Sequence, residues 1–246
     1  MMMMNLDKNK FLVKLKSGLN QLNISYSTEQ IEQLWEYYVF FITENKKYNL
    51  SAITEMEEVI TKHFLDSAVI LTQIELKDVK RWLDIGTGAG FPGLVLKLFL
   101  PGHSFYLLDS SSKKINFLNQ LIYKLGLSGV NAVHGRVEDL AKELEWRASF
   151  DFVTSRAVAS TNILVEYTIP FLRKGGSAFL YKGPEYKKEL DEAENALKIL
   201  GTEIKKIVEL DVPGLDAERY LIILEKTEKT PKKYPRRAGI PNKRPL

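Results

Sequence analysis

Residues 82–93, WLDIGTGAGFPG, place a glycine-rich turn between two apolar stretches. The first stretch predicts a buried strand, and the stretch 94–99 after the turn predicts a helix. Gly86, Gly88 and Gly90 between them allow unusual backbone dihedrals and the close approach of a ligand. A strand, a tight turn and a helix form the start of a βα unit, which limits the chain to folds with a largely parallel sheet.

The rest of the chain repeats this pattern. Seven short apolar runs alternate with amphipathic stretches: RWLDIG, SFYLLD, VNAVHG, FDFVTS, SAFLYK, IKKIVEL and RYLIILEK. The alternation predicts a twisted α/β sheet with helices on its faces. Only VPGLDAE separates the last two runs, which is too short for a helix, so we expect the last strand to run antiparallel to its neighbour.

The segment before the sheet has a helical pattern. Apolar residues at three- and four-residue steps predict a helix that begins at a capping box of Ser27 and Gln30 and ends near 45–47. Its aromatic side chains, Trp35, Tyr38 and Phe41, are expected to pack in the core rather than form a stacking surface.

A second helix is expected from Thr54, where Glu57 repeats the capping pattern, through about residue 72. His63 and Asp66 are three residues apart and so share one face of an α-helix. We expect a hydrogen bond between them that holds this helix against the ligand crevice, which in open α/β sheets lies at the carboxyl ends of the strands. The alternative is that the two side chains form a catalytic pair. Asn49 either caps the first helix or covers a bound ligand.

Positive charge is concentrated at the C-terminus. The formal net charge is +4, whereas residues 226–246 contain eight Lys or Arg and one Glu, a net of +7. Their four prolines predict an extended segment. One interpretation is a nucleic-acid clamp in which Tyr234, Arg236 and Arg237 stack on bases, and the other is a solvated tail. On the clamp interpretation, removing 231–246 weakens RNA binding and spares the affinity for other ligands.

Composition excludes several kinds of site. The chain has no cysteine, hence no disulfide, thiolate metal site or cysteine nucleophile, and three scattered histidines argue against zinc, so no metal is expected. No apolar run approaches the roughly 20 residues of a membrane span, and no apolar signal-peptide core follows the N-terminus. We expect a cytoplasmic protein that does not contact the membrane.

The glycine turn favours a cationic ligand. Phe91 stands where a dinucleotide-binding loop has its third glycine, and no Gly-Lys-Ser/Thr follows. Asp84 would repel a diphosphate and suits a ligand with ammonium and sulfonium groups. Asp109 ends the second strand, where it could accept hydrogen bonds from ribose hydroxyls, cap the next helix, or do both.

Four more residues lie at or just after strand ends at the same edge. Val137 and Glu138, after the third strand, could offer a backbone amide and a carboxylate to an adenine ring. Arg156 follows the fourth strand, a position that favours a functional role over a surface ion pair. Lys182 ends the fifth strand, either facing an RNA phosphate or as a surface lysine.

Together these features resemble class I methyltransferases that use S-adenosylmethionine: a Rossmann-like seven-stranded sheet with its last strand antiparallel. A closer resemblance is to the RsmG family, also called glucose-inhibited division protein B. Its motifs run through the chain as YNLSAI (48–53), KHFLDS (62–67), LDIGTGAGFPG (83–93), LLDSSSKKINFL (107–118), GRVED (135–139), SRAVA (155–159), YKG (181–183) and PKKYPRRAGIPNKRPL (231–246). We expect a helical extension (1–75), a methyltransferase domain (76–226) and a basic tail (227–246).

The resemblance implies an enzyme that methylates N7 of a guanine in the decoding region of 16S ribosomal RNA. The implied partner is small-subunit ribosomal RNA or the assembling small subunit, and we expect a monomer. The implied cofactor is S-adenosylmethionine. It would be bound by Gly86, Phe91, Val137, Glu138 and Arg156, with Gly88 and Asp109 added from the wider superfamily. Val137 departs from the alanine common in the family, which matters little if the contact is through the backbone.

The expected chemistry agrees with this resemblance. Guanine N7 already has a lone pair, so an in-line displacement needs no general base, and no residue is assigned as catalytic. Methylation of pyrimidine C5 usually requires a cysteine, which is absent, and SRAV replaces the Asn/Asp-Pro-Pro-aromatic motif of exocyclic amine methylation. Two alternatives stay open: a small-molecule methyltransferase, which leaves the basic tail unexplained, and a non-catalytic RNA-binding module.

Overall fold

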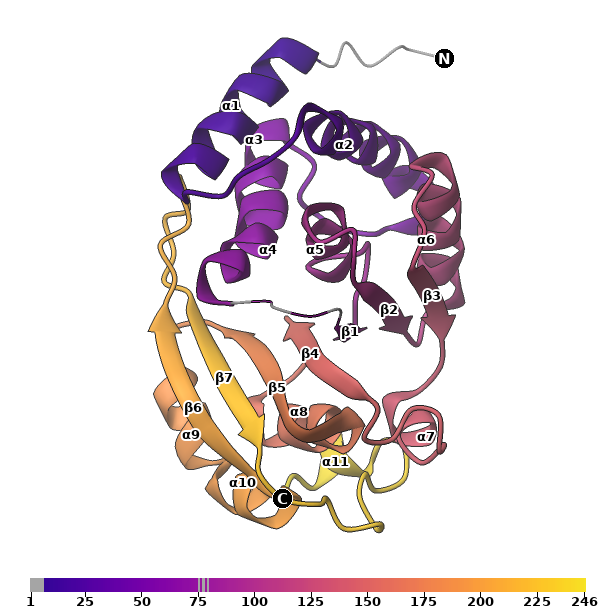
Figure 1. The fold of residues 1–246 in the computed structure, drawn as a ribbon, viewed down its shortest axis with the longest axis vertical. Helices are drawn as coiled ribbons and strands as arrows, with labels where there is room; N and C mark the ends of the chain where they lie inside the picture. Colours follow the sequence, from indigo (N-terminus) through magenta and orange to yellow (C-terminus); the bar gives the residue numbers. More distant parts are fainter. Residues whose placement is uncertain (1–6, 75, 77, 79) are drawn as a thin grey trace.

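A seven-stranded sheet forms the centre of the computed structural model, which describes residues 7–74, 76, 78 and 80–246 (Figure 1). The strand order is β3-β2-β1-β4-β5-β7-β6. The strands are β1 (Arg81–Ile85), β2 (Ser104–Asp109), β3 (Val130–His134), β4 (Phe150–Arg156), β5 (Leu172–Lys182), β6 (Thr202–Glu209) and β7 (Tyr220–Lys226). All seven predicted strands are therefore present.

The pairing of the strands confirms the predicted fold class. Strands β1 to β5 pair in parallel, and β7 is antiparallel to both β5 and β6, as the short VPGLDAE connection predicted. Because parallel strands end at the same edge of a sheet, the loops after β1, β2, β3 and β4 meet there.

Helices cover both faces of the sheet (Figure 1). One layer contains α1 (Lys8–Gln21), α2 (Thr28–Tyr48), α3 (Met56–Val59), the π-helix η1 (Ile60–Leu65), α4 (Asp66–Ala68), the 3-10 helix η2 (Val69–Gln73), α5 (Gly93–Phe99) and α6 (Ser112–Lys124). The other contains α7 (Val137–Leu140), α8 (Thr161–Thr168), the 3-10 helix η3 (Ile169–Phe171), α9 (Tyr186–Asp191), α10 (Glu194–Leu200) and α11 (Ile240–Lys243).

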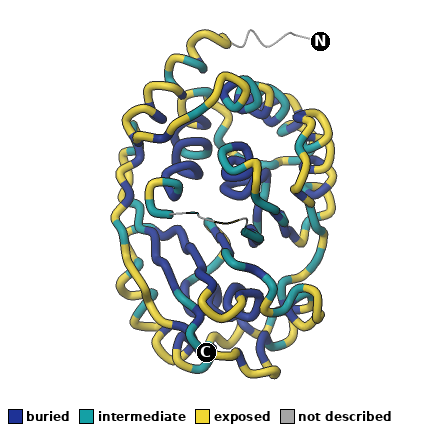
Figure 2. The backbone as a smooth tube through the Cα atoms, in the orientation of Figure 1, coloured by how far each residue is buried: buried dark blue, intermediate teal, exposed yellow. Residues whose placement is uncertain are grey.

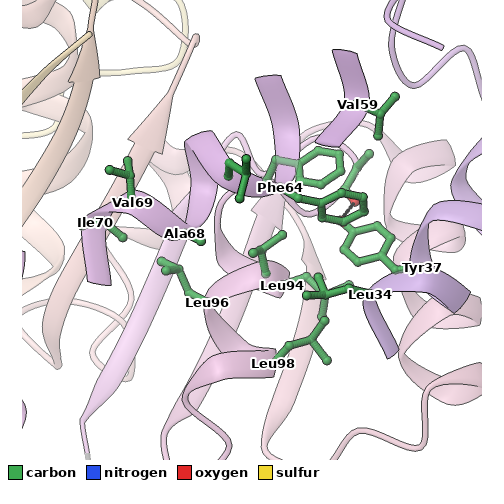
Figure 3. Close-up of a cluster of buried hydrophobic side chains, with 14 of the residues drawn as sticks. Leu34, Tyr37, Val59, Phe64, Ala68, Val69, Ile70, Leu94, Leu96 and Leu98 are labelled. Atoms are coloured by element: carbon green, nitrogen blue, oxygen red, sulfur yellow. Dashed lines mark hydrogen bonds between the residues drawn. The ribbon is translucent and has the colours of Figure 1, made fainter. Parts of the chain in front are cut away.

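Two hydrophobic cores lie on either side of the sheet. Neighbouring residues of a strand point to opposite faces, so Trp82 packs in one core and Leu83 in the other. Figure 2 shows the buried backbone inside and the exposed backbone around it. Figure 3 shows the core under the N-terminal helices, where Tyr37 and Phe64 pack near Leu94. The N-terminal helices therefore share a core with the sheet.

The first predicted helix is confirmed at both ends. In α2 the Ser27 hydroxyl accepts a hydrogen bond from the Gln30 N–H, and the Gln30 side chain accepts one from the Ser27 N–H. Asn49 ends the helix in a left-handed conformation, so it acts as the C-cap. Tyr38 and Phe41 are buried, and Trp35 packs against the same core, as predicted.

The second predicted helix is present as a continuous helical stretch from Met56 to Gln73, but the predicted capping pattern at its start was wrong and the stretch is not a regular α-helix. Glu55 precedes the first helical residue without a side-chain capping bond, and α3, η1, α4 and η2 follow one another. The π-helical turn η1 changes the angular spacing of side chains, so the faces expected for an α-helix do not apply beyond Val59.

The C-terminal tail is not a free arm. Tyr234 is buried, which excludes the predicted stacking of its ring on a base, and residues 240–243 form the short helix α11. The tail lies beside α8 and α7 (Figure 1). Six of the eight cationic residues in 226–246 are exposed: Lys229, Lys232, Lys233, Arg237, Lys243 and Arg244. The exposed cationic side chains therefore belong to a segment that is packed against the rest of the protein.

Within the described ranges, no helix is both long and apolar enough to cross a membrane. In the same part of the chain, no three His, Asp or Glu side chains gather as a metal site.

Candidate functional site

Loops from four neighbouring strands surround a cavity of about 330 Å³, here named the loop cavity. Its walls come from β1, β2, β3 and β4 and from three more distant segments: Ile85, Gly86, Leu108, Asp109, Ser110, Lys114, Gly135, Arg136, Val137, Glu138, Ala157, Val158, Tyr167, Gly239 and Asn242. A larger cavity, about 560 Å³, lies beyond the α1–α2 turn, lined mostly by aliphatic side chains away from the strand ends.

Asp109 joins the glycine turn to the loop after β2. One carboxylate oxygen accepts a hydrogen bond from the Gly88 N–H at 3.0 Å, and the other accepts one from the Ser111 N–H at 2.9 Å. The Lys114 ammonium lies 3.6 Å from the first oxygen. Ser111, not Asp109, is the N-cap residue of α6. The carboxylate is thereby fixed at the cavity wall with lone pairs left to accept further hydrogen bonds.

Glu138 forms the opposite part of the loop cavity. It is only 4% exposed, and one of its oxygens accepts hydrogen bonds from the Gly239 N–H at 3.0 Å and the Tyr167 hydroxyl at 3.4 Å. Burial and the neighbouring Glu138 carboxylate raise the pKa of Tyr167 to about 12, so its hydroxyl stays protonated and can donate. Val137 lines the cavity beside Glu138.

Asp84 of β1 and Phe91 at the end of the glycine turn lie behind the cavity rather than on its surface. Asp84 is buried and accepts hydrogen bonds from the Gly93 N–H at 2.9 Å and the Thr154 hydroxyl at 2.8 Å. Burial raises the pKa of Asp84 to about 6. Its expected interaction with a ligand ammonium group is replaced by these bonds, because the start of α5 lies against it. Phe91 stacks between Tyr37 and His63.

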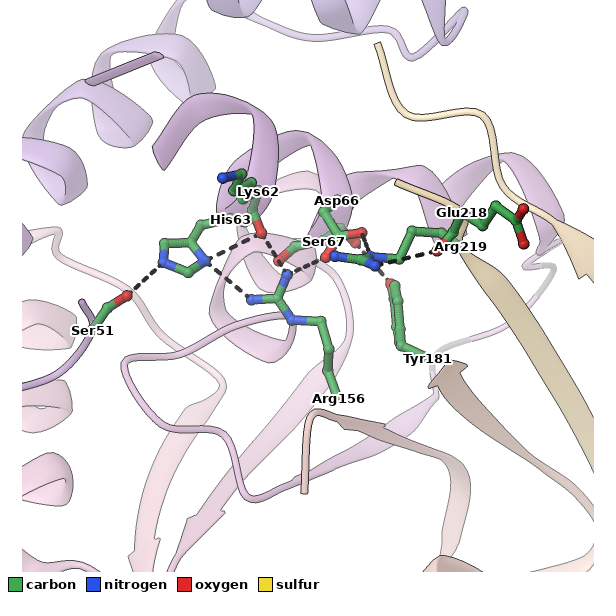
Figure 4. A network of polar contacts seen from close by, with 9 residues as sticks. All are labelled: Ser51, Lys62, His63, Asp66, Ser67, Arg156, Tyr181, Glu218 and Arg219. Carbon is green, nitrogen blue, oxygen red and sulfur yellow. Dashed lines mark hydrogen bonds and ion pairs between the residues drawn. The ribbon is translucent and has the colours of Figure 1, made fainter. Parts of the chain in front are cut away.

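Arg156 borders a second cavity of about 340 Å³, here named the arginine cavity. The arginine cavity adjoins the loop cavity at Ala157, which lines both. The guanidinium donates to the Lys62 carbonyl at 2.9 Å and pairs with the Asp66 carboxylate (Figure 4). Arg219 lies 3.4 Å from the other Asp66 oxygen. Two arginines thus face one buried carboxylate.

The predicted hydrogen bond between His63 and Asp66 was wrong. His63 Nε2 lies 3.0 Å from the Ser51 hydroxyl, and its Nδ1 faces the Lys62 carbonyl, whereas Asp66 pairs with the arginines (Figure 4). Three residues do not bring side chains together across the π-helical turn. Burial, with the Arg156 charge, lowers the pKa of His63 to about 3, so the ring is neutral near pH 7.

Lys182 is not a surface lysine, although it lines the arginine cavity, and its contact with an RNA phosphate stays a prediction. Its ammonium is buried, donates to the Ala159 carbonyl at 2.7 Å, and pairs with the Glu189 carboxylate at 2.6 Å. The Glu189 carboxylate also accepts from the N–H and hydroxyl of Thr161. Lys182 therefore ties β5 to the start of α8 and to α9.

The structure brings together four of the seven residues predicted to bind the cofactor. Gly86, Asp109, Val137 and Glu138 line the loop cavity, Gly88 bonds to Asp109 behind it, Arg156 lines the arginine cavity, and Phe91 lies beneath the turn. Their binding roles stay predictions. Sequence reasoning missed Tyr167, Gly239 and Asn242, because no local pattern indicates that α8 and the tail return to these loops.

Comparison with solved structures gives the fold. TrmN from Thermus thermophilus aligns over 74% of this chain and 53% of its own, with a TM-score of 0.52 and 15% identity. The fibrillarin/Nop5p complex matches 66% of this chain and 81% of its own, with a TM-score of 0.51 and 18% identity. Such low identities establish the architecture alone.

Comparison with sequences gives the family. A family model described as rRNA small subunit methyltransferase G matches residues 30–220. The ribosomal RNA small subunit methyltransferase G of Desulfitobacterium hafniense is 47% identical over 92% of this chain and 93% of its own length. That of Alkaliphilus oremlandii is 43% identical over 94% of this chain and 97% of its own. The chain therefore belongs to the ribosomal RNA small subunit methyltransferase G family.

Proposed function

We propose that this protein transfers a methyl group from S-adenosylmethionine to N7 of a guanine in the decoding region of 16S ribosomal RNA. The observation that carries the proposal is the loop cavity, which Asp109, Gly86 and Glu138 line together although they follow three different strands. Family membership and the arrangement of these strand ends support the same activity.

The loop cavity suits the proposed cofactor in size and in the polarity of its walls. Its 330 Å³ lies within the range of roughly 300–1,000 Å³ typical of small-molecule sites. The Asp109 carboxylate would accept hydrogen bonds from the ribose hydroxyls, and Val137 and Glu138 would border the purine. Gly86 leaves space where a side chain would otherwise enter. When bound, the cofactor supplies an electrophilic methyl group on a sulfonium.

The protein's part in the reaction is orientation and exclusion of water. Guanine N7 attacks with its own lone pair, so no side chain has to remove a proton. His63 is neutral near pH 7 because its pKa is about 3, so it places no positive charge beside the base that becomes cationic. The Asp66 carboxylate, which Arg156 and Arg219 share, offsets part of the charge of Arg156. The proposed displacement forms no covalent enzyme intermediate.

We assign the target base to the arginine cavity. It adjoins the loop cavity at Ala157, so a base held there would lie next to the donor. We further propose that the protein acts in the cytoplasm as a monomer without a metal. The proposed organisation is a helical extension (1–75), a methyltransferase domain (76–226) and a basic tail (227–246).

Two measurements test this function. Calorimetry should show S-adenosylhomocysteine binding to the protein, and Asp109→Ala should abolish it while Asp139→Ala, an acid outside the loop cavity, should not. Methyl-labelled donor should then transfer label to small-subunit ribosomal RNA and not to a panel of small acceptors. Donor binding without transfer to RNA, or labelling of a small acceptor instead, would overturn the proposal.

A further inference from the structure

The C-terminal tail is clamped to the body at a buried ion pair. Arg236 donates to the Glu166 carboxylate through Nε at 3.0 Å and Nη2 at 2.6 Å, and its backbone N–H donates at 2.7 Å. Glu166 is fully buried in α8. Arg147 adds three hydrogen bonds to the carbonyls of Thr230, Pro231 and Tyr234. A buried charge pair with this many bonds fixes the tail's path.

After the Arg236–Glu166 ion pair, the chain forms part of the wall of the loop cavity. The Gly239 N–H donates to Glu138 at 3.0 Å, and Gly239 and Asn242 both line the cavity. Pro241 between them is buried. These residues meet the cavity beside Glu138 and Tyr167. The tail therefore forms part of the cavity opposite the ribose position assigned to Asp109.

We propose that residues 238–242 form the outer wall of the donor cavity and hold the purine ring of the cofactor, with the Asn242 amide as its hydrogen-bonding partner. This rests on the proposed function of the loop cavity. An asparagine amide both donates and accepts, which matches the adjacent donor and acceptor atoms on an adenine edge. The seated tail also gives Glu138 a donor and shields it from water.

The sequence led us to expect that removal of the tail weakens RNA binding and spares donor affinity. If the tail forms part of the cavity wall, its removal weakens donor binding as well. A stop after Arg237 separates the two cases, because it removes the wall but keeps Arg236, Tyr234 and the Arg147 hydrogen bonds. The Arg236–Glu166 ion pair should remain, and the truncated protein should therefore keep its stability.

The test is calorimetric titration of the full-length protein and the 1–237 variant with S-adenosylhomocysteine. We expect the truncated protein to keep its urea midpoint and to bind at least about tenfold more weakly, and Asn242→Ala to bind about threefold to tenfold more weakly. The matched control is the full-length double variant Lys243→Ala/Arg244→Ala, which removes tail charge and keeps the wall. Its affinity should stay within twofold.

Equal affinity of the full-length and truncated proteins would refute the proposed role of the tail as a cavity wall. It would leave the proposed donor site itself unaffected. A comparable loss in the charge variant would also overturn it, since charge rather than packing would then be responsible. Absence of binding by the full-length protein would instead refute the proposed function of the cavity. If the truncated protein also loses stability, Asn242→Ala alone decides, because that side chain is exposed.

Discussion

At the scale of single residues, the turn after β1 requires glycine at position 86, because a side chain there has no space. Gly86 has a φ of +69°, and a Cβ placed there would lie 2.4 Å from a methyl carbon of Val158. Gly88 has a similar φ of +60°, but the nearest atom to its Cβ would be 3.9 Å away. The two positions carry the same backbone strain and differ in packing.

We predict that Gly86→Ala weakens S-adenosylhomocysteine binding at least about tenfold, because the added methyl group pushes Val158 into the loop cavity. Gly88→Ala should lose less affinity while paying the same left-handed penalty of about 1–2 kcal/mol in unfolding free energy. Calorimetry and urea unfolding measure the two effects. Adding Val158→Ala to Gly86→Ala should restore part of the affinity, and a double variant that binds no better would contradict this explanation.

The second residue-scale prediction concerns acid stability. The folded-state pKa of His63 is about 3, whereas an unfolded histidine has a pKa of about 6.5. Between these values the unfolded chain binds the proton and the folded chain does not, so the free energy of unfolding falls as pH drops from 6.5 toward 3. Asp84 acts oppositely, because its raised pKa lets the folded state bind a proton first below about pH 6.

His63→Gln should therefore lose less stability than the unmodified protein between pH 7 and pH 4. Glutamine keeps a hydrogen-bonding group for Ser51 but does not titrate. Urea unfolding at several pH values gives the difference between the two proteins, in which the contribution of Asp84 cancels. Parallel stability curves over this range would show that His63 has an ordinary pKa.

At the scale of elements, Arg156 links the end of β4 to the N-terminal helices. It reaches the Lys62 carbonyl in η1 and the buried Asp66 carboxylate at the start of α4. By contrast, Arg173 pairs with Asp151 on the surface and is half exposed. The two arginines therefore make ion pairs of similar chemistry in very different surroundings.

We predict that Arg156→Ala lowers the unfolding free energy by about 3 kcal/mol, because it leaves Asp66 with less compensation in a buried site. Arg156→Lys should cost less, since it keeps the charge but loses the forked geometry. Arg173→Ala should cost less than about 1 kcal/mol. Urea unfolding of the three variants checks this order, and equal losses at Arg156 and Arg173 would refute it.

The strands were predictable from the sequence, and the irregular helices were not. Each strand is a short apolar run between turn residues, so local chemistry determines it. The π-helical turn η1 buries Ile60, Thr61, Phe64 and Leu65 against other elements, and such a register depends on tertiary packing. The burial of Lys182 likewise depends on Glu189, which comes from the following helix.

The site was predictable only where it follows strand ends. Topology alone places Gly86, Asp109, Val137 and Glu138 at one edge of the sheet. The residues of the loop cavity that come from α8 and the tail were missed. Asn242 reaches the loop cavity because Arg236 pairs with Glu166, which lies 70 residues earlier in the chain. A pairing over that distance leaves no local pattern.

At the scale of the whole molecule, the tail combines a buried anchor with an exposed basic surface. Lys232 and Lys233 are exposed and lie outside both cavities. We predict that Lys232→Ala/Lys233→Ala weakens RNA binding and lowers the slope of log affinity against log salt concentration by about 0.7 for each phosphate that is no longer neutralised. The reason is that fewer counterions are released on binding.

Salt titrations of RNA binding check this, with Lys16→Ala/Lys198→Ala as the control that removes two exposed lysines of α1 and α10. The control should keep the salt slope of the unmodified protein, and both variants should keep its donor affinity. An unchanged slope in the tail variant would exclude Lys232 and Lys233 from the RNA interface.

The most direct test of the proposed reaction is to locate the transferred methyl group. Small-subunit ribosomal RNA is incubated with purified protein and methyl-labelled S-adenosylmethionine, and the labelled atom is mapped by reductive cleavage at N7-methylguanine. We predict label on N7 of one guanine in the decoding region, and its loss in Asp109→Ala. Label on ribose, on an exocyclic amine or at a guanine outside that region would contradict the account.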